Sequence, residues 1–143
     1  MGKAVSLRVE DISYNSIDDR NIIRFIEAVR NGIPFSKFLS FSKNTPFSMG
    51  EWSNFLNMSE RTLQRYKSGK KNFDPIYAEK ILHISLLYNL GIEVFGSREK
   101  LNTWLETYNL ALGGVKPKEL LDSSFGISLL RDELTRIEQG ILA

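Results

Sequence analysis

Apolar residues recur three or four positions apart along most of this 143-residue chain, which is the spacing of helices with one buried face. One apolar stripe, at residues 22–29, is followed by Gly32, a residue typical of helix C-termini. The longest stripe begins after Pro75 and runs to Gly91, and it is apolar over more than half of its circumference. We therefore expect this segment to be a central helix around which the other helices pack in an all-α fold.

The two ends of the chain differ from the middle. The N-terminal residues alternate loosely between apolar and polar positions, so residues 1–17 are expected to form either a stray strand or a disordered arm. Towards the other end, Ser97 is positioned to cap a further helix. A loop of small residues follows at 110–117, and a last helix is predicted at 127–138, before Gly140.

Between residues 47 and 73 the pattern predicts two short helices joined by a tight turn. Ser48 can cap the first helix, and Glu51, three residues later, can complete a capping box. Ser59 can cap the second helix, which is predicted at Ser59 to Ser68, with Leu63 facing inward. The inward residues expected of the pair are Trp52, Phe55, Leu56, Leu63 and Tyr66. This arrangement is typical of a helix-turn-helix.

The second of these helices carries a concentration of basic residues. From Arg61 to Lys71 there are five basic side chains and no acidic one. A basic helix face is often simply solvated, but here it coincides with the helix that would enter a DNA groove. Because one such unit covers only a few base pairs, specific binding implies a homodimer on two half-sites.

Side-chain chemistry assigns three roles within this predicted DNA-binding set. Long side chains that can pair with base edges in the major groove are Arg61, Gln64 and Arg65. Hydroxyl groups near the helix starts that suit phosphate oxygens are those of Ser48, Ser59 and Thr62. Flanking amines that add non-specific, salt-sensitive attraction are those of Lys67, Lys70 and Lys71.

The composition of the chain argues against a disulfide-bonded, a membrane-spanning or a secreted protein. The net charge is only +2, and the absence of cysteine excludes disulfides and fits a reducing cytosol. No apolar run approaches the ~20 residues needed to span a bilayer. Arg8 and Glu10 interrupt the only N-terminal apolar stretch, so we expect no secretory signal, a cytoplasmic location and no membrane partner.

Catalysis has few candidate groups. The single histidine, His83, lies in an apolar helix and is expected to be a hydrogen-bonded packing residue rather than a base or a metal ligand. Gly113 and Gly114 follow no predicted strand and belong to no phosphate-binding motif. No His, Asp or Glu cluster has metal-ligand spacing. We therefore predict a protein that is not an enzyme and needs no metal or other cofactor.

Longer motifs resemble a known family. The segments Trp104–Asp122 (WLETYNLALGGVKPKELLD), Phe125-Gly126 and Leu134–Ala143 (LTRIEQGILA) resemble the toxin-binding domain of the Xre/MbcA/ParS antitoxins. The sequence pattern of that family consists, in order, of the motifs WL, PN-x-AL-x-G, P-x-x-LL-D/T, a glycine and a final L-x-R-I-x-x-G. Upstream, Ser59–Arg65 and Glu93–Gly96 are similar to its Xre-type helix-turn-helix region.

The resemblance covers about residue 20 to the end of the chain, with small departures. Tyr108 stands where the family often has proline, and Leu129 or Leu130 where valine is common. The resemblance implies three parts: an arm at 1–17, an Xre-like helix-turn-helix domain at 18–96, and a toxin-binding domain at 97–143.

The resemblance also implies a function, that of a type II antitoxin. Such proteins neutralise a co-encoded toxin with a RES domain, which degrades NAD⁺, and repress their own operon through operator DNA. The final helix and tail are the toxin-binding candidates: Arg136, Gly140, Ile141, Leu142 and Ala143. Gly140 would be a flexible joint, and the terminal carboxylate could stand in for a phosphate of the dinucleotide in the active site of the toxin.

Two other classes stay open at the level of sequence. The first is a stand-alone transcriptional regulator in which residues 97–143 serve only dimerisation or effector binding. The second is an enzyme, which the inventory of side chains disfavours. An adjacent gene for a RES-domain protein would separate the antitoxin from the plain regulator.

Overall fold

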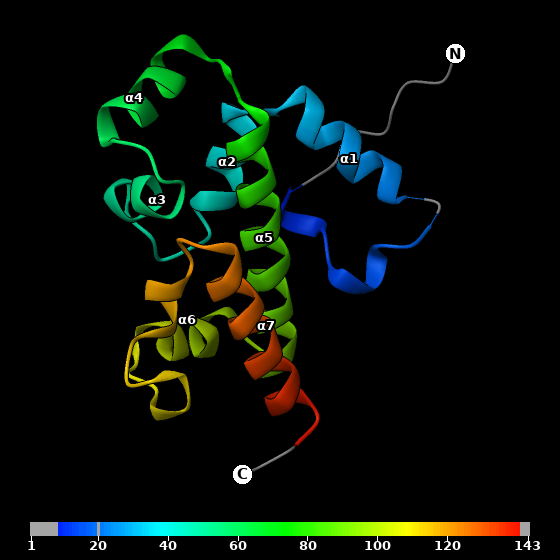
Figure 1. Cartoon of the computed structure of the whole chain (residues 1–143), viewed down its shortest axis with the longest axis vertical. Coiled ribbons are helices and arrows are strands. Elements are labelled where there is room, and N and C mark those ends of the chain that lie inside the picture. The colour runs from blue at the N-terminus through cyan, green and yellow to red at the C-terminus, as the bar shows by residue number, and fades with distance from the viewer. Residues whose placement is uncertain (1–8, 20, 141–143) are drawn as a thin grey trace.

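The computed structural model describes residues 9–19 and 21–140, and within this part of the chain almost every regular element is a helix (Figure 1). Seven α-helices follow one another: α1 Ile22–Asn31, α2 Phe35–Ser42, α3 Met49–Phe55, α4 Glu60–Gly69, α5 Pro75–Phe95, α6 Arg98–Glu106 and α7 Ser124–Glu138. The predicted all-α fold is confirmed. None of the helices formed by the described residues is long and apolar enough to cross a membrane.

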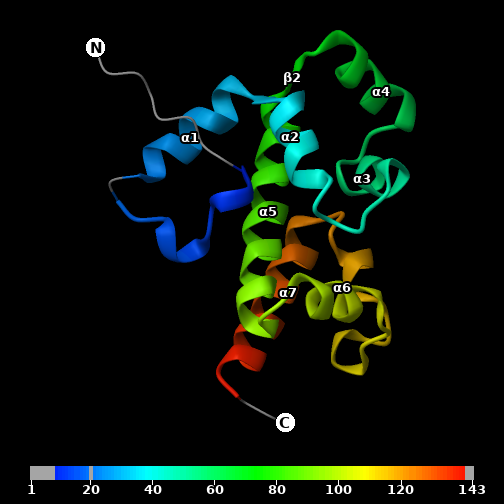
Figure 2. The same ribbon diagram turned by 180° about the vertical axis from the view of Figure 1, so that it is seen from behind.

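Helix α5 is the axis of the molecule, as its long apolar stripe predicts. It packs against α1, α6 and α7. Helices α2, α3 and α4 lie beside its first half, and α6 and α7 lie beside its second half (Figures 1 and 2). One hydrophobic core runs through both halves, from Phe38 and Trp52 at one end to Leu101 and Leu134 at the other.

Aromatic rings fill the core around the helix-turn-helix. Trp52 is fully buried, and its ring meets the edge of Phe38, with a centroid distance of 5.0 Å. Phe47 packs edge-on against Phe55, also at 5.0 Å. Edge-to-face pairs of this kind are worth ~0.5–1.5 kcal/mol beyond their buried area. They fix α3 against α2 and against the loop that joins the two helices.

A two-residue antiparallel bridge, absent from the sequence prediction, joins the start of α2 to the start of α5. Strand β1 (Ile33–Pro34) pairs with β2 (Asn72–Phe73). Gly32 precedes the bridge with φ +84°, and a Cβ there would overlap the carbonyl oxygen of Phe73. Glycine is therefore required at this position both by the backbone angle and by the close approach of β2.

The N-terminal segment differs from the expected strand or disordered arm. Residues 9–17 contain two 3₁₀ helices, η1 (Val9–Asp11) and η2 (Tyr14–Ser16), and the side chains of Val9 and Ile12 are buried in the core. The amide of Asn89 donates a hydrogen bond of 2.6 Å to the carbonyl of Ile12. The expectation is wrong here because these apolar residues fill space beside α2 and α5. Residues 1–8 lie outside the described part.

Two helix boundaries also differ from the sequence prediction. Helix α5 does not end at Gly91 but runs to Phe95 and is capped by Gly96, at φ +82°. A Cβ at Gly91 would overlap the buried side chain of Leu101, so this glycine serves the close packing of α6 rather than a helix end. Helix α7 begins three residues earlier than predicted because Ser123 caps it, accepting from the backbone N–H of Gly126 at 2.9 Å.

The segment between α6 and α7 is held by short elements. A β-bridge between Asn109 and Val115 closes a loop that contains the 3₁₀ helix η3 (Leu110–Leu112), and a second 3₁₀ helix, η4 (Pro117–Leu120), follows it. Leu112 and Leu121 anchor the segment in the core, whereas Leu110 is 93% exposed. The predicted loop of small residues is therefore folded.

Candidate functional site

The first helix of the predicted helix-turn-helix begins as its sequence indicates. The Oγ of Ser48 accepts from the backbone N–H of Glu51 at 3.1 Å, and a carboxylate oxygen of Glu51 accepts from the backbone N–H of Ser48 at 3.0 Å. This capping box satisfies two of the free donors at the start of α3. The inward residues Trp52, Phe55 and Leu56 are all buried, as predicted.

The turn between α3 and α4 depends on an asparagine in the left-handed region. Asn57 has φ +57°, a conformation that asparagine tolerates better than most residues. Its side-chain amide donates to the carbonyl of Asp122, 65 positions further along the chain, at 3.3 Å. Ser59 then starts α4, and its Oγ accepts from the backbone N–H of Thr62 at 3.1 Å.

The inner face of α4 fixes how this helix is rotated about its axis. Leu63 and Tyr66 are buried, and the ring of Tyr66 stacks on that of Phe73, with centroids 4.6 Å apart. The Tyr66 hydroxyl donates to a carboxylate oxygen of Asp74 at 3.0 Å. Burial and this hydrogen bond raise the pKa of Tyr66 above its ordinary value. Because the inner face is anchored, the opposite face of α4 points outward.

That outward face carries the predicted DNA-binding residues. Arg61, Gln64 and Arg65 are exposed, and α4 lies at one end of the molecule, away from α6 and α7 (Figure 1). Exposed residues of the predicted set are Ser48, Ser59, Arg61, Gln64, Arg65, Lys67, Lys70 and Lys71, and only Thr62 is half-buried. The structure thus brings the residues of α4 and of the loop after it to one end of the molecule and leaves the long side chains of α4 accessible. Ser48 lies apart from them at the start of α3, next to Glu51, whose carboxylate contacts Lys118.

Some members of this set also have local structural tasks. The hydroxyl oxygens of Ser59 and Thr62 lie 3.0 Å apart and form a hydrogen bond. Lys70 is the C-cap of α4, at φ +49°, and the amine of Lys71 lies 5.7 Å from the centre of the Tyr66 ring. These residues therefore support the ends of α4 as well as carrying the charge predicted to meet DNA.

Two of the predicted toxin-binding residues, Arg136 near the end of α7 and Gly140 just after it, lie at the opposite end of the molecule from α4 (Figure 2). Arg136, in the last turn of α7, donates from Nε and Nη2 to the same carboxylate oxygen of Glu133, at 3.1 and 2.9 Å. Gly140 has φ +68°, and its N–H donates to the carbonyl of Ile137 at 3.0 Å. The other three candidates, Ile141, Leu142 and Ala143, lie outside the described residues.

Polar contacts that the sequence did not reveal attach the segment between α6 and α7 to the helix-turn-helix and to α5. The Lys118 amine, in η4, donates to Glu51 at 2.6 Å and to Glu106 at 2.8 Å. The amine of Lys80 donates at 2.6 Å to the carbonyl of Asp122, the same oxygen that Asn57 contacts. We call the first group, Glu51, Glu106 and Lys118, the Lys118 cluster. Its members are far apart in sequence and have no common motif, so no pattern in the chain pointed to it.

The charges of the Lys118 cluster stabilise one another. Hydrogen bonds to Glu106 and Glu51 raise the pKa of Lys118 above its ordinary value. Partial burial by itself would raise the pKa of Glu51. The hydrogen bonds that Glu51 accepts from Lys118 and from the Ser48 backbone outweigh burial, and the pKa is lowered.

His83 does not occupy the packing position predicted for it. Its side chain is 52% exposed, and its Nε2 lies 3.7 Å from a carboxylate oxygen of Glu79, one helical turn earlier. The prediction failed because this position faces outward on α5, whereas the residues on either side of it in the sequence, Leu82 and Ile84, are buried. Among the described residues, no group of three or more His, Asp or Glu side chains could hold a metal ion.

The geometry of α3 and α4 defines the class of the N-terminal half as a helix-turn-helix. Comparison with known proteins agrees: residues 24–85 match the antitoxin Xre-like helix-turn-helix domain. Residues 90–140 match the antitoxin Xre/MbcA/ParS C-terminal toxin-binding domain.

A relative that is similar over both regions supports the same assignment. The chain is similar to the protein named Antitoxin Xre of Photorhabdus laumondii subsp. laumondii, with 24% identity over 120 residues, which cover 82% of this chain and 81% of the relative. The chain belongs to the Xre-type antitoxins, with a helix-turn-helix followed by a toxin-binding domain.

Proposed function

We propose that this protein neutralises a co-encoded RES-domain toxin, which degrades NAD⁺, and represses its own operon as a homodimer bound to operator DNA in the cytoplasm. The observation that carries the proposal is the combination of two matched regions in one chain. One is an Xre-like helix-turn-helix with an exposed basic helix, and the other is a toxin-binding domain. The motifs of residues 104–122 and 134–143 favour a RES-domain partner among toxins.

On the toxin side, the proposal assigns inhibition to the end of α7 and the tail that follows. Arg136 is held by Glu133 at the last turn of the helix, and the positive φ of Gly140 changes the direction of the chain directly after it. The residues from Gly140 onwards provide a joint and two apolar side chains, Ile141 and Leu142. In the pocket of a dinucleotide-degrading enzyme, this segment would occupy the space of the substrate and so block it.

On the DNA side, the proposal assigns base contacts to Arg61, Gln64 and Arg65. Arginine can pair bidentately with guanine, and glutamine with adenine. The hydroxyls of Ser48, Ser59 and Thr62 would meet phosphates at the helix starts, and the amines of Lys67, Lys70 and Lys71 would add salt-dependent attraction. Since α4 and the end of α7 lie at opposite ends of the molecule (Figure 2), one molecule can serve both partners.

The experiment that tests the proposal is neutralisation in cells that express the RES-domain toxin encoded beside this gene. The intact chain should restore growth, and a variant lacking Gly140–Ala143 should not. The matched control is Arg65→Ala, which lies at the other end of the molecule and should restore growth as well as the intact chain. A truncated variant that still rescues the cells would refute the role of the tail, and failure of the intact chain would refute the RES partner.

A further inference from the structure

Helix α1 leaves much of its apolar face uncovered. Its apolar stripe predicts a buried side, but among those residues only Phe25 is buried. Ile22, Ile23 and Ile26 are 37, 52 and 38% exposed. Exposing three neighbouring isoleucines to water is unfavourable, and contiguous exposed apolar surface of this kind usually marks an interaction site.

An apolar groove lies directly beside this isoleucine ridge. It has a volume of about 340 Å³ and runs between α1 and the outward side of α5. The apolar side chains that line it include Ile17, Ile22 and Ile26 from the N-terminal part of the chain and Leu82 and Leu86 of α5. A ridge and a groove of matching chemistry therefore stand side by side on one surface.

The charges at the rim of this surface are balanced. Arg30 of α1 and Glu79 of α5 both line the groove. A strongly charged partner such as nucleic acid gains little binding energy from a rim with one positive and one negative charge. A second copy of the chain brings its own Arg30 and Glu79, which can pair with Glu79 and Arg30 of the first copy. Two-fold contacts require a self-complementary patch of this kind, in which each copy offers both the ridge and the groove.

The position of the patch also favours a second copy over the toxin. Apart from Ile17, its residues belong to α1 and to α5 up to Leu86, within or next to the matched helix-turn-helix region at 24–85. The toxin-binding match begins only at residue 90. Helix α1 lies on the opposite side of α5 from α3 and α4 (Figures 1 and 2). Pairing through α1 therefore leaves α4 uncovered in both copies.

We propose that the surface formed by Ile22, Ile23, Ile26 and the adjoining groove on α5 is the homodimer interface of this protein. The inference rests on the homodimer of the proposed function and adds where the two copies meet. Each copy would place its isoleucine ridge against the groove of the other, and the two recognition helices would face away from the contact.

The test is light scattering coupled to size-exclusion chromatography on the full chain over a dilution series. The intact protein should be a dimer, and the double variant Ile23→Asp/Ile26→Asp should raise the dimer dissociation constant by about tenfold or more. Both positions are exposed in the monomer, so circular dichroism of the variant should be unchanged. The matched control is Leu110→Asp/Phe125→Asp, which alters two side chains that are 93 and 92% exposed away from the groove and should remain dimeric.

Different outcomes would contradict the homodimer itself and the location of its interface. An intact chain that is monomeric at every concentration would overturn the homodimer of the proposed function itself. A double variant as dimeric as the intact chain would overturn only this interface. If that variant also lost affinity for the RES-domain toxin while Arg65→Ala kept it, the groove would be a toxin contact instead.

Discussion

The amine of Lys118 lies 2.6 Å from a carboxylate oxygen of Glu51, although the two residues are 67 positions apart. Glu51 is at the same time the capping-box residue of α3, the first helix of the helix-turn-helix. Lys118 belongs to η4 in the toxin-binding domain. One ion pair thus connects the start of the DNA-binding helix pair to the part of the chain that binds the toxin.

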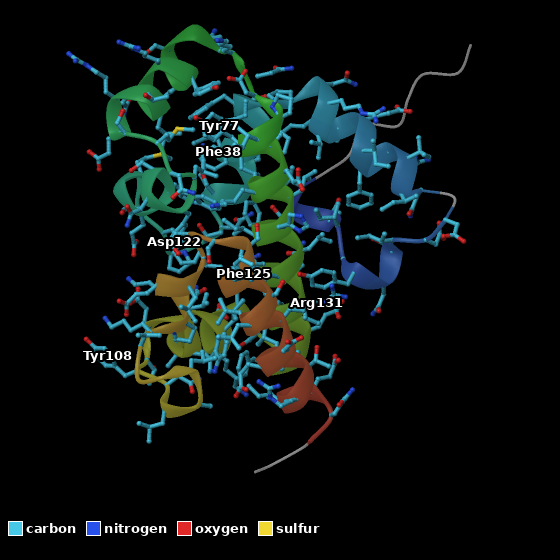
Figure 3. All side chains as sticks on the ribbon, viewed as in Figure 1. Phe38, Tyr77, Tyr108, Asp122, Phe125 and Arg131 are labelled. Carbon is cyan, nitrogen blue, oxygen red and sulfur yellow. The ribbon has the colours of Figure 1, made fainter. Side chains whose placement is uncertain are left out.

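Removing the amine should weaken the attachment between these regions. We expect Lys118→Met to lower the free energy of unfolding by about 1 kcal/mol, since the pair is partly shielded from water and Glu106 also loses its partner. Urea denaturation followed by circular dichroism measures this change. As a control, Lys116→Met removes a longer contact of 3.7 Å to Glu106 and a cation–π contact of 5.3 Å with the ring of Tyr108 (Figure 3), and it should have a smaller effect. Equal stability of the Lys118→Met variant and the intact chain would contradict the role given to the cluster.

The same pair predicts a pH dependence of stability. The pKa of Glu51 is lowered in the folded state, so its stabilisation is present above the ordinary value of 4.5 and is lost as the pH falls through the folded pKa. The pKa of Lys118 is raised, so its stabilisation is complete below 10.5 and is lost as the pH rises through the folded pKa. The stability difference between the intact chain and Lys118→Met should therefore be constant around neutral pH and shrink in acid below pH 4.5. A difference that stays the same at pH 3 would argue against this assignment.

Gly126 should resist substitution because of packing rather than backbone angle. A Cβ at this position would overlap the carbonyl oxygen of Leu120 in η4, so Gly126→Ala must push η4 away from α7. We expect a loss of about 2 kcal/mol in the free energy of unfolding, measured by urea denaturation. Gly69→Ala is the matched control: nothing lies within 4 Å of its added Cβ, and alanine in a helix favours stability by up to ~1 kcal/mol. The idea fails if the two variants are equally stable.

DNA binding should depend on Arg65 in a sequence-specific way. If Arg65 reads a base, Arg65→Ala should weaken operator binding by about 1–3 kcal/mol in a gel-shift titration at fixed salt. Lys70→Ala should instead weaken binding evenly across sequences and reduce the salt slope by about one. Unchanged operator affinity of the Arg65→Ala variant would remove this residue from the recognition surface.

Local signals in the sequence were sufficient for much of the fold. Both helix starts of the helix-turn-helix could be predicted from Ser48, Glu51 and Ser59, because a capping interaction spans only three residues. The long α5 followed from its apolar stripe. The periodicity also predicted α1 correctly, but it could not show that Ile23 would remain exposed, because that depends on how much of α1 the neighbouring helix covers.

Other features required the three-dimensional arrangement. Gly91 was interpreted as a helix end because glycine is common there, whereas in the fold it makes room for Leu101. The contact of Asn57 with Asp122 and the Lys118 cluster join distant segments, and nothing local marks them. His83 was placed inside because its neighbours are apolar, although helical periodicity allows a single outward position among them.

The most direct test of the central claim is NAD⁺ consumption by the purified RES-domain toxin encoded beside this gene. We predict that the intact chain stops NAD⁺ loss when it is equimolar with the toxin, and that the Arg65→Ala variant does so equally well. Continued NAD⁺ loss in the presence of a molar excess of the intact chain would contradict it.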